Sequence, residues 1–252
     1  LTLDPRDPGA LAAVDRLAVQ AERWEEVADV IRRRRDIADS AEERHDLTLR
    51  LGDVLALPLA DPAGALTAYG EVIRDRPDEV RAMEGLEGLA EANPELAGEV
   101  GLLLEDAYEA TGAWEKLSQV IRSRLDATTD PAEQQALRLR YADLAGGKTG
   151  DAGGAYRALE AAFLADPSDV ALQDRIIEAA EAADEHEALA KAFSSAMSSL
   201  RAADQSALAS KVAHLYDVVL GRPEDAEGFY RSVLANDPLD EAAFGALKDL
   251  YT

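Results

Sequence analysis

The segment Ala65-Leu-Thr-Ala-Tyr-Gly-Glu-Val-Ile-Arg-Asp-Arg-Pro77 decides the fold, because its spacing recurs in the later segments 155–167 and 226–238. Each copy has an alanine, then apolar side chains four and seven residues later, and a proline twelve residues later. The first three positions share one face of an α-helix, and the proline ends that helix. The matching positions are Ala65, Tyr69, Val72 and Pro77, then Ala155, Leu159, Ala162 and Pro167, then Ala226, Tyr230, Val233 and Pro238. A fixed pattern of this kind predicts a helical repeat protein.

The prolines that close the copies divide the chain into units, and Leu3-Asp4-Pro5 resembles the end of a preceding repeat. Pro5 and Pro77 are 72 residues apart, and Pro167 and Pro238 are 71 apart, whereas 90 residues separate Pro77 from Pro167. The middle unit is therefore longer by 18 residues, which is the length of one helix with its turn.

A second landmark places this insertion. Trp24 and His186 each lie 19 residues after a closing proline, whereas Trp114 lies 37 residues after Pro77. We therefore expect an extra helix near 78–94.

An odd helix disturbs the alternation of a two-helix repeat, so we expect the stack to kink at this helix or the helix to pack atypically. Gly85 and Gly88 would allow a close backbone approach there.

The recurring pattern resembles the second helix of the tetratricopeptide repeat. Leu51, Gly52 and Leu55 fit the first helix of that family, with one extra residue in the following loop. The resemblance implies an all-α fold, a right-handed superhelical stack of antiparallel helix hairpins with about 14 helices. It implies one repeat array over 1–252, with units at about 6–77, 78–167 and 168–238 and the start of a fourth at 239–252.

The expected helices follow from the apolar periodicity and from Pro and Gly stop signals, and no stretch has the alternation of a β-strand. They cover roughly 8–21, 24–38, 41–57, 62–75, 78–92, 95–111, 114–128, 131–146, 151–165, 168–183, 186–201, 204–220, 224–235 and 239–252. Both ends of the chain read as parts of repeats, so we expect a fragment of a longer array whose neighbouring repeats are partners.

The net charge is the strongest compositional signal. The chain has 50 acidic and 26 basic residues, a formal net charge of −24. Such a surface repels phosphates, which argues against nucleic acid as a partner. No apolar run reaches the length of a membrane span, and no signal peptide opens the sequence, so membrane insertion is not expected and a cytoplasmic location is favoured. The excess of Arg over Lys and the high alanine content are typical of GC-rich bacterial genomes.

The sequence offers no evidence of enzymatic activity, and we expect neither a cofactor nor a metal. There is no cysteine, and the histidines His45, His186 and His214 are far apart. Gly146–Gly150 contains Gly-Lys-Thr but lacks the first glycine and the preceding strand of a phosphate-binding loop, so a helix–helix turn is favoured. The run Arg32–Arg35 spreads around a helix, which favours solvated or paired arginines over an anion site. Trp24 and Trp114 recur at one repeat position, which favours packing over ligand binding.

The resemblance implies that the first helix of each hairpin lines a concave face. Its outward positions in this register are mostly acidic, with Leu49, Leu102 and Leu139 as apolar anchors and Ser210 among the polar positions. The candidate partner-binding residues are Asp46, Asp53, Glu99, Asp106, Glu109, Asp143, Asp174, Glu178, Glu181, His214 and Asp217.

These residues suggest a non-enzymatic scaffold whose acidic concave face binds a basic or extended segment of a partner protein. The alternative is that the acidity is global, in which case it marks no particular face. Two further functions stay open: a structural spacer with no groove ligand, and a regulatory repeat domain of a larger enzyme.

Overall fold

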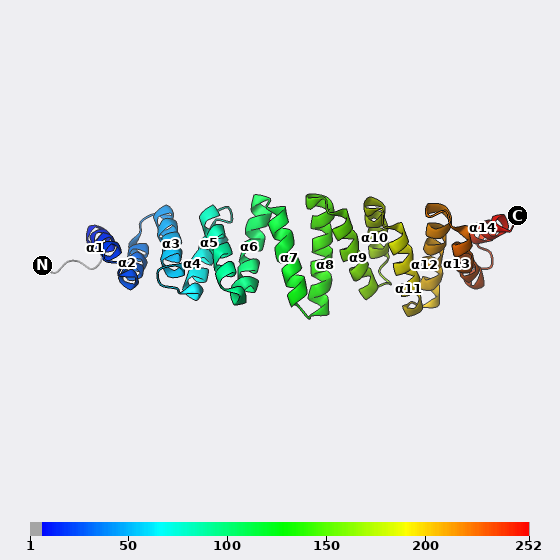
Figure 1. The fold of residues 1–252 in the computed structure, drawn as a ribbon, viewed down its shortest axis with the longest axis horizontal. Coiled ribbons are helices and arrows are strands. Elements are labelled where there is room, and N and C mark those ends of the chain that lie inside the picture. Colours follow the sequence, from blue (N-terminus) through cyan, green and yellow to red (C-terminus); the bar gives the residue numbers. More distant parts are fainter. Residues whose placement is uncertain (1–6, 252) are drawn as a thin grey trace. The chain divides into compact units, whose positions relative to one another are not determined.

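The structure is a computed structural model that describes residues 7–251. The described residues form fourteen α-helices and no strand, which confirms the all-α fold (Figure 1). The helices are α1 (Pro8–Gln20), α2 (Trp24–Ile37), α3 (Ala41–Ala56), α4 (Pro62–Asp75), α5 (Val80–Ala92), α6 (Ala97–Thr111), α7 (Trp114–Ala127), α8 (Pro131–Leu144), α9 (Ala152–Ala165), α10 (Val170–Ala183), α11 (His186–Ala196), α12 (Ala202–His214), α13 (Pro223–Asn236) and α14 (Glu241–Leu250). Short 3-10 turns precede α6 and follow α11, at Pro94–Leu96 and Met197–Ser199.

Acidic side chains start many of these helices. A carboxylate at the N-cap accepts a hydrogen bond from a backbone N–H of the first turn, which would otherwise lack a partner. Six aspartates do this, at 2.8–3.1 Å: Asp7, Asp61, Asp130, Asp151, Asp169 and Asp240. Ser40 and Glu79 cap α3 and α5 in the same way. Part of the negative charge therefore serves the helix termini.

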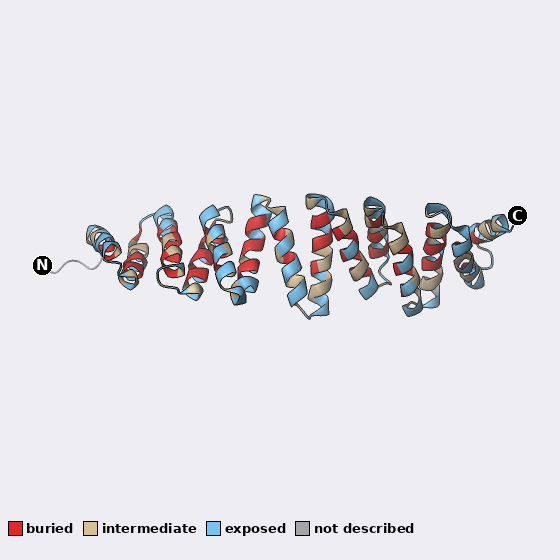
Figure 2. Cartoon of the chain, viewed as in Figure 1, coloured by how far each residue is buried: buried red, intermediate tan, exposed pale blue. Residues whose placement is uncertain are grey.

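The chain forms two compact units, unit 1 (Leu1–Val120) and unit 2 (Ile121–Thr252), whose common boundary lies within α7. In both units the buried residues lie on the helix faces that meet neighbouring helices (Figure 2). The expected repeat boundaries remain a prediction.

In unit 1, successive helices pack as antiparallel neighbours, and helices two apart also meet. α3 contacts α5 in one layer, and α4 contacts α6 in the other. The extra helix expected near 78–94 is present as α5. The atypical packing expected there is wrong, because α5 packs on both α3 and α4 as the next helix of the stack.

Tyr69 fixes the spacing of these helices. Its ring is buried, and a Cβ atom added at Gly52 or at Gly85 would come within 2.6 Å of it. The two glycines therefore admit the ring between α3 and α5, as expected for Gly85. Space around Gly88 is open, so no close approach occurs there.

In unit 2, α9 packs against α8 and α10, and it also contacts α11. The rings of Phe163 and Phe193 join α9 to α11, with centroids 4.9 Å apart. α12 and α13 form the last large hairpin, on which α14 packs.

In unit 2 the two hairpins α8–α9 and α12–α13 have a first helix that ends in a π-helical turn. These turns are η2 (Ala145–Thr149) after α8 and η4 (Leu215–Val219) after α12. A π turn accommodates one more residue than an α turn. The segment Gly146–Gly150 belongs to such a turn and ends with Gly150 at φ 72°. A left-handed conformation of this kind favours glycine.

Candidate functional site

Three of the candidate residues form a stripe on α6 in unit 1. Glu99, Asp106 and Glu109 are all exposed, and Leu102 lies between them with 55% of its surface exposed. Their spacing of three, four and three residues places them on one helix face. We call these four residues the α6 stripe.

The surroundings of the α6 stripe are unusually acidic. From residue 82 to residue 115, which covers most of α5 and all of α6, the chain has nine carboxylates and no Lys, Arg or His. Most of them are exposed: Glu84, Glu91, Glu95, Glu99, Asp106, Glu109 and Glu115. This segment itself contains no basic residue, whereas α8, α10 and α12 of unit 2 each carry at least one cation among their acids.

Glu87 is a carboxylate of this segment that a cation from outside it neutralises. It accepts hydrogen bonds from Lys116 Nζ at 2.6 Å and from the Tyr108 hydroxyl at 2.7 Å. Burial alone would raise the pKa of Glu87, but these bonds outweigh burial and lower it. Glu87 is therefore held by its partners and is not available to a ligand.

The α3 candidates belong to a different surface. Asp46 is exposed, but Asp53 accepts hydrogen bonds from the Tyr69 hydroxyl at 2.8 Å and from Arg81 at 2.9 Å. α3 lies in the layer of α5, whereas α6 lies in the layer of α4. The structure therefore does not bring the α3 and α6 residues of unit 1 together. Leu49, expected to be an exposed anchor, is only 3% exposed and belongs to the core, so that expectation is wrong.

In unit 2 several candidate carboxylates are already paired. Asp143 of α8 binds Arg175 of α10 at 2.5 Å, and Asp174 of α10 binds Lys211 of α12 at 3.1 Å. These pairs are partly exposed, so they stabilise the fold only weakly, but they reduce the local negative charge.

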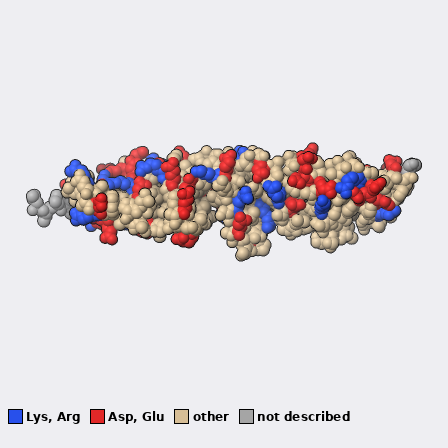
Figure 3. Space-filling model, viewed as in Figure 1, with Lys and Arg blue, Asp and Glu red and all other residues tan. Residues whose placement is uncertain are grey.

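Asp217 is also engaged, since it accepts a hydrogen bond from the Tyr230 hydroxyl at 2.8 Å. The remaining candidates of unit 2, Glu178, Glu181 and His214, are exposed. Figure 3 shows acidic and basic side chains interleaved over much of one face.

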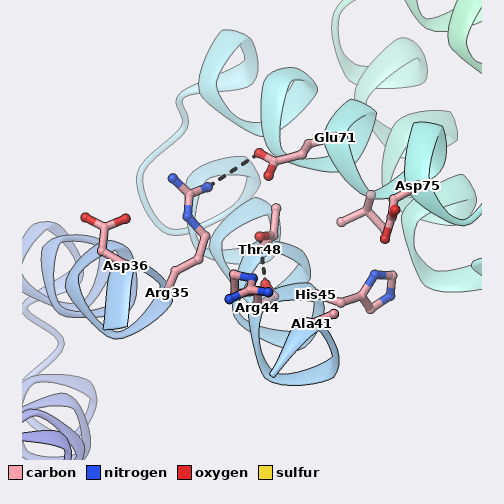
Figure 4. Close-up of a pocket in the computed structure, with 9 residues that line it drawn as sticks. Arg35, Asp36, Ala41, Arg44, His45, Thr48, Glu71 and Asp75 are labelled. Carbon is pink, nitrogen blue, oxygen red and sulfur yellow. Dashed lines mark hydrogen bonds and ion pairs between the residues drawn. The ribbon is translucent and has the colours of Figure 1, made fainter. Parts of the chain in front are cut away.

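A polar pocket of about 580 Å³ lies between α2, α3 and α4 (Figure 4). Arg35 binds Glu71 across it at 3.5 Å, and Arg44 donates to the carbonyl of Ala38 at 2.9 Å. His45 lies 3.1 Å from Glu79. The lining of this pocket carries both positive and negative side chains, so the pocket favours neither a simple anion nor a simple cation.

Three arginines of the run Arg32–Arg35 in α2 are paired with carboxylates, in agreement with the expectation of solvated or paired side chains. Arg33 binds Asp29 at 2.8 Å, and Arg34 binds Asp15 of α1 at 3.0 Å. Arg50 of α3 holds the same Asp15 through two hydrogen bonds, at 2.5 and 2.8 Å. Asp15 is buried, which would raise its pKa, but the two arginines outweigh burial and lower it.

A more apolar pocket of about 590 Å³ lies in unit 2, and we call it the α10–α12 pocket. Two of the candidate residues, Glu181 and His214, line it. The residues that sequence reasoning missed are its apolar walls and part of its rim: Ile177, Leu189, Leu215, Val219, His186 and Lys211. Of these, Leu215 and Val219 lie in the π turn η4, which has no clear signal in the sequence.

The described residues contain neither a cluster of metal ligands nor a membrane-spanning helix. No group of three or more His, Cys, Asp and Glu side chains is arranged to hold a metal ion. Among the helices of residues 7–251, none combines the length and the apolar character needed to cross a bilayer.

Comparison with known proteins gives structural neighbours only. No family model and no curated protein matches the chain. The C-terminal part of a TPR repeat-containing protein from Cytophaga hutchinsonii is 11% identical, with a TM-score of 0.34, over 92% of this chain and 98% of that one. A thermophilic TPR protein from Thermus thermophilus is 18% identical, with a TM-score of 0.30, over 82% and 100%. A Naa15/Naa10 complex bound to HypK-THB contains a chain that is 14% identical, with a TM-score of 0.35, over 95% of this chain and 39% of that one.

These TM-scores are below 0.5, so the assignment of the fold is based on the helix hairpins of this chain and not on these neighbours. The helices, their antiparallel packing and the closing prolines all agree with the repeat pattern read from the sequence. The chain therefore has an all-α helical repeat fold whose hairpins are similar to the tetratricopeptide repeat.

Proposed function

We propose that this chain is a protein-interaction scaffold that binds a basic segment of a partner protein along the α6 stripe of unit 1. The observation that carries the proposal is the segment 82–115 around this stripe, which presents seven exposed carboxylates and no basic residue. A surface of this charge attracts a cationic partner and speeds its encounter with the chain.

The geometry of the stripe suits a short extended segment. From Glu99 to Glu109 the helix rises about 15 Å, a length that about five extended residues cover. Leu102 adds an apolar contact in the middle of the stripe. The expected ligand therefore has basic side chains on both sides of one apolar side chain.

The experiment that tests binding along the α6 stripe uses a labelled nine-residue peptide of lysine and serine with one central leucine. Its fluorescence anisotropy is measured with the whole chain and with the double variant E99K/D106K. The control variant D39K/D249K makes the same charge change at two exposed carboxylates outside the stripe.

We expect the stripe variant to lose at least about tenfold in affinity, about 1.4 kcal/mol, and the control variant to lose much less. Added salt should weaken binding, because the screening length at physiological ionic strength is only about 8 Å. Equal losses in the two variants would mean that the acidity acts globally. No binding to the unmutated chain would favour a structural spacer.

A further inference from the structure

We propose that the α10–α12 pocket is a second binding site, one that takes the apolar face of a cationic amphipathic helix from a partner protein. It lies wholly in unit 2 and shares no residue with the α6 stripe. The proposal therefore does not depend on the function proposed for unit 1.

The walls of the pocket are apolar and come from three elements. Ile177 of α10, Leu189 of α11, and Leu215 and Val219 of η4 surround the space. Leu189 is fully buried and forms part of the core, whereas Val219 is 42% exposed and lies at the rim. A partner side chain that enters the pocket would therefore meet apolar carbon on several sides, which favours its removal from water.

The π turn builds the side of the pocket formed by η4. The N–H of Leu220 donates to the carbonyl of Leu215 at 2.9 Å, a bond across five residues. This wider turn makes Leu215 and Val219 wall residues. π turns occur often at functional sites, where they change the direction of side chains.

The lining of the pocket contains one basic residue, Lys211, and one carboxylate, Glu181, and only the basic residue is already paired within residues 7–251. Lys211 lies at the rim, but its ammonium group binds Gln173 at 3.0 Å and Asp174 at 3.1 Å. Glu181 is exposed at the opposite helix, and no ion pair of the described residues involves it. A partner with Lys or Arg beside its apolar side chains would therefore find a carboxylate at the rim.

The size of the pocket decides the kind of occupant. Its volume of about 590 Å³ lies within the range of ligand sites, about 300–1,000 Å³. One leucine side chain fills only part of this space. Apolar residues at i, i+3 and i+4 of a helix share one face and enter such a pocket together. A helix with leucines at these positions and lysines on the flanks satisfies both the walls and the rim.

The probe for the test is a labelled 14-residue helical peptide of leucine and lysine, with leucines on one face. A second peptide has the same leucines with glutamate in place of lysine. Binding is measured by fluorescence anisotropy with the whole chain and with four variants. S210W fills the pocket from its rim, and A207W places the same side chain one turn earlier on α12, outside the pocket lining. E181K reverses the rim charge, and E178K makes the same change one turn earlier on α10.

We expect S210W and E181K each to weaken binding of the leucine–lysine peptide at least tenfold. A207W and E178K should change binding less than threefold, and the glutamate peptide should bind at least tenfold more weakly than its lysine counterpart. Circular dichroism of each variant checks that its helix content is unchanged.

Three outcomes would overturn the proposal. Equal binding to S210W and the unmutated chain would place the peptide elsewhere. Equal losses in E181K and E178K would reduce the effect to general acidity. Equal binding of the two peptides would remove the role of the carboxylate rim.

Discussion

Asp15 holds the first three helices of unit 1 together, and replacing it by asparagine tests this role most directly. Its carboxylate is buried and accepts hydrogen bonds from Arg34 of α2 and from both terminal nitrogens of Arg50 of α3. D15N keeps the shape of the side chain but removes its charge. The two arginines then lose their shared counter-charge.

The size of the effect follows from the burial of the three groups. Removing one partner of a fully buried ion pair costs about 3–5 kcal/mol. The side chains of Arg34 and Arg50 are 25% and 37% exposed, so water can partly solvate them when the charge is lost. We therefore expect D15N to reduce the free energy of unfolding of α1–α3 by about 3 kcal/mol, at the lower end of that range.

Native-state hydrogen exchange is the appropriate assay, because local unfolding of a repeat protein need not follow global unfolding. Amides of α1 should exchange about 100-fold faster in D15N, which corresponds to about 2.7 kcal/mol. The control is D29N, which breaks the pair of Asp29 with Arg33, whose side chains are both more than half exposed. Its effect should stay below about 1 kcal/mol.

The ion pairs of Asp15 with Arg34 and Arg50 also predict how the stability of α1–α3 changes at acidic pH. The pKa of Asp15 is lowered in the folded chain, so its stabilising contribution is present above the ordinary carboxyl pKa and is lost as the pH falls through the lowered value. D15N should remove this part of the acid response. Exchange rates in α1 that are the same for D15N and D29N would refute the argument that Asp15 joins the three helices.

Three further predictions concern the packing and ends of the helices. G85A should destabilise unit 1 in urea denaturation, because its new Cβ would lie 2.6 Å from the buried Tyr69 ring. G88A faces open space and should stabilise α5 by about 0.5–1 kcal/mol. Equal changes of the urea midpoint in the two variants would contradict the packing of the Tyr69 ring against Gly85. Burial and the Asp53 carboxylate raise the pKa of Tyr69, so the contribution of this side chain to stability is complete below about pH 10 and is lost only as the pH rises through the raised pKa. Phenolate absorbance should show that Tyr69 is still protonated at a pH at which free tyrosine has ionised. Ionisation of Tyr69 at the pH of free tyrosine would count against its hydrogen bond to Asp53. D61A should cost about 1 kcal/mol in thermal unfolding, because the N–H of Gly64 loses its acceptor at 3.0 Å, whereas D61N should keep the cap.

Much of the helix order could be predicted, because the residues that start and end the helices of this chain act locally. Asp61-Pro62 and Asp130-Pro131 start α4 and α8 where expected, since an aspartate caps the first turn and proline suits the next position. Trp24, Trp114 and His186 begin α2, α7 and α11 as their shared register predicts. These signals act within a few residues, so they can be read without the fold.

The candidate site could be predicted only in part, because it depends on which helices share a layer. The resemblance placed α3 and α6 on one concave face, but the extra helix α5 reverses the alternation, and α6 lies with α4. Leu49 occupies an outward position in the expected register and is nevertheless buried. Ion pairs such as Asp143 with Arg175 join residues 32 apart, and no local pattern reveals them. The π turns differ from α turns by one residue, which periodicity cannot resolve.

The six aspartate caps allow the electric field of this protein to be changed without redesigning its helices. Asparagine is about as good an N-cap as aspartate, because its side-chain oxygen accepts the same hydrogen bond. Replacing all six would change the formal charge from −24 to −24 + 6 = −18 and would leave each first turn with its acceptor. Colloidal behaviour and crystallisation could thus be tuned at the caps, while the carboxylates of the α6 stripe remain as they are.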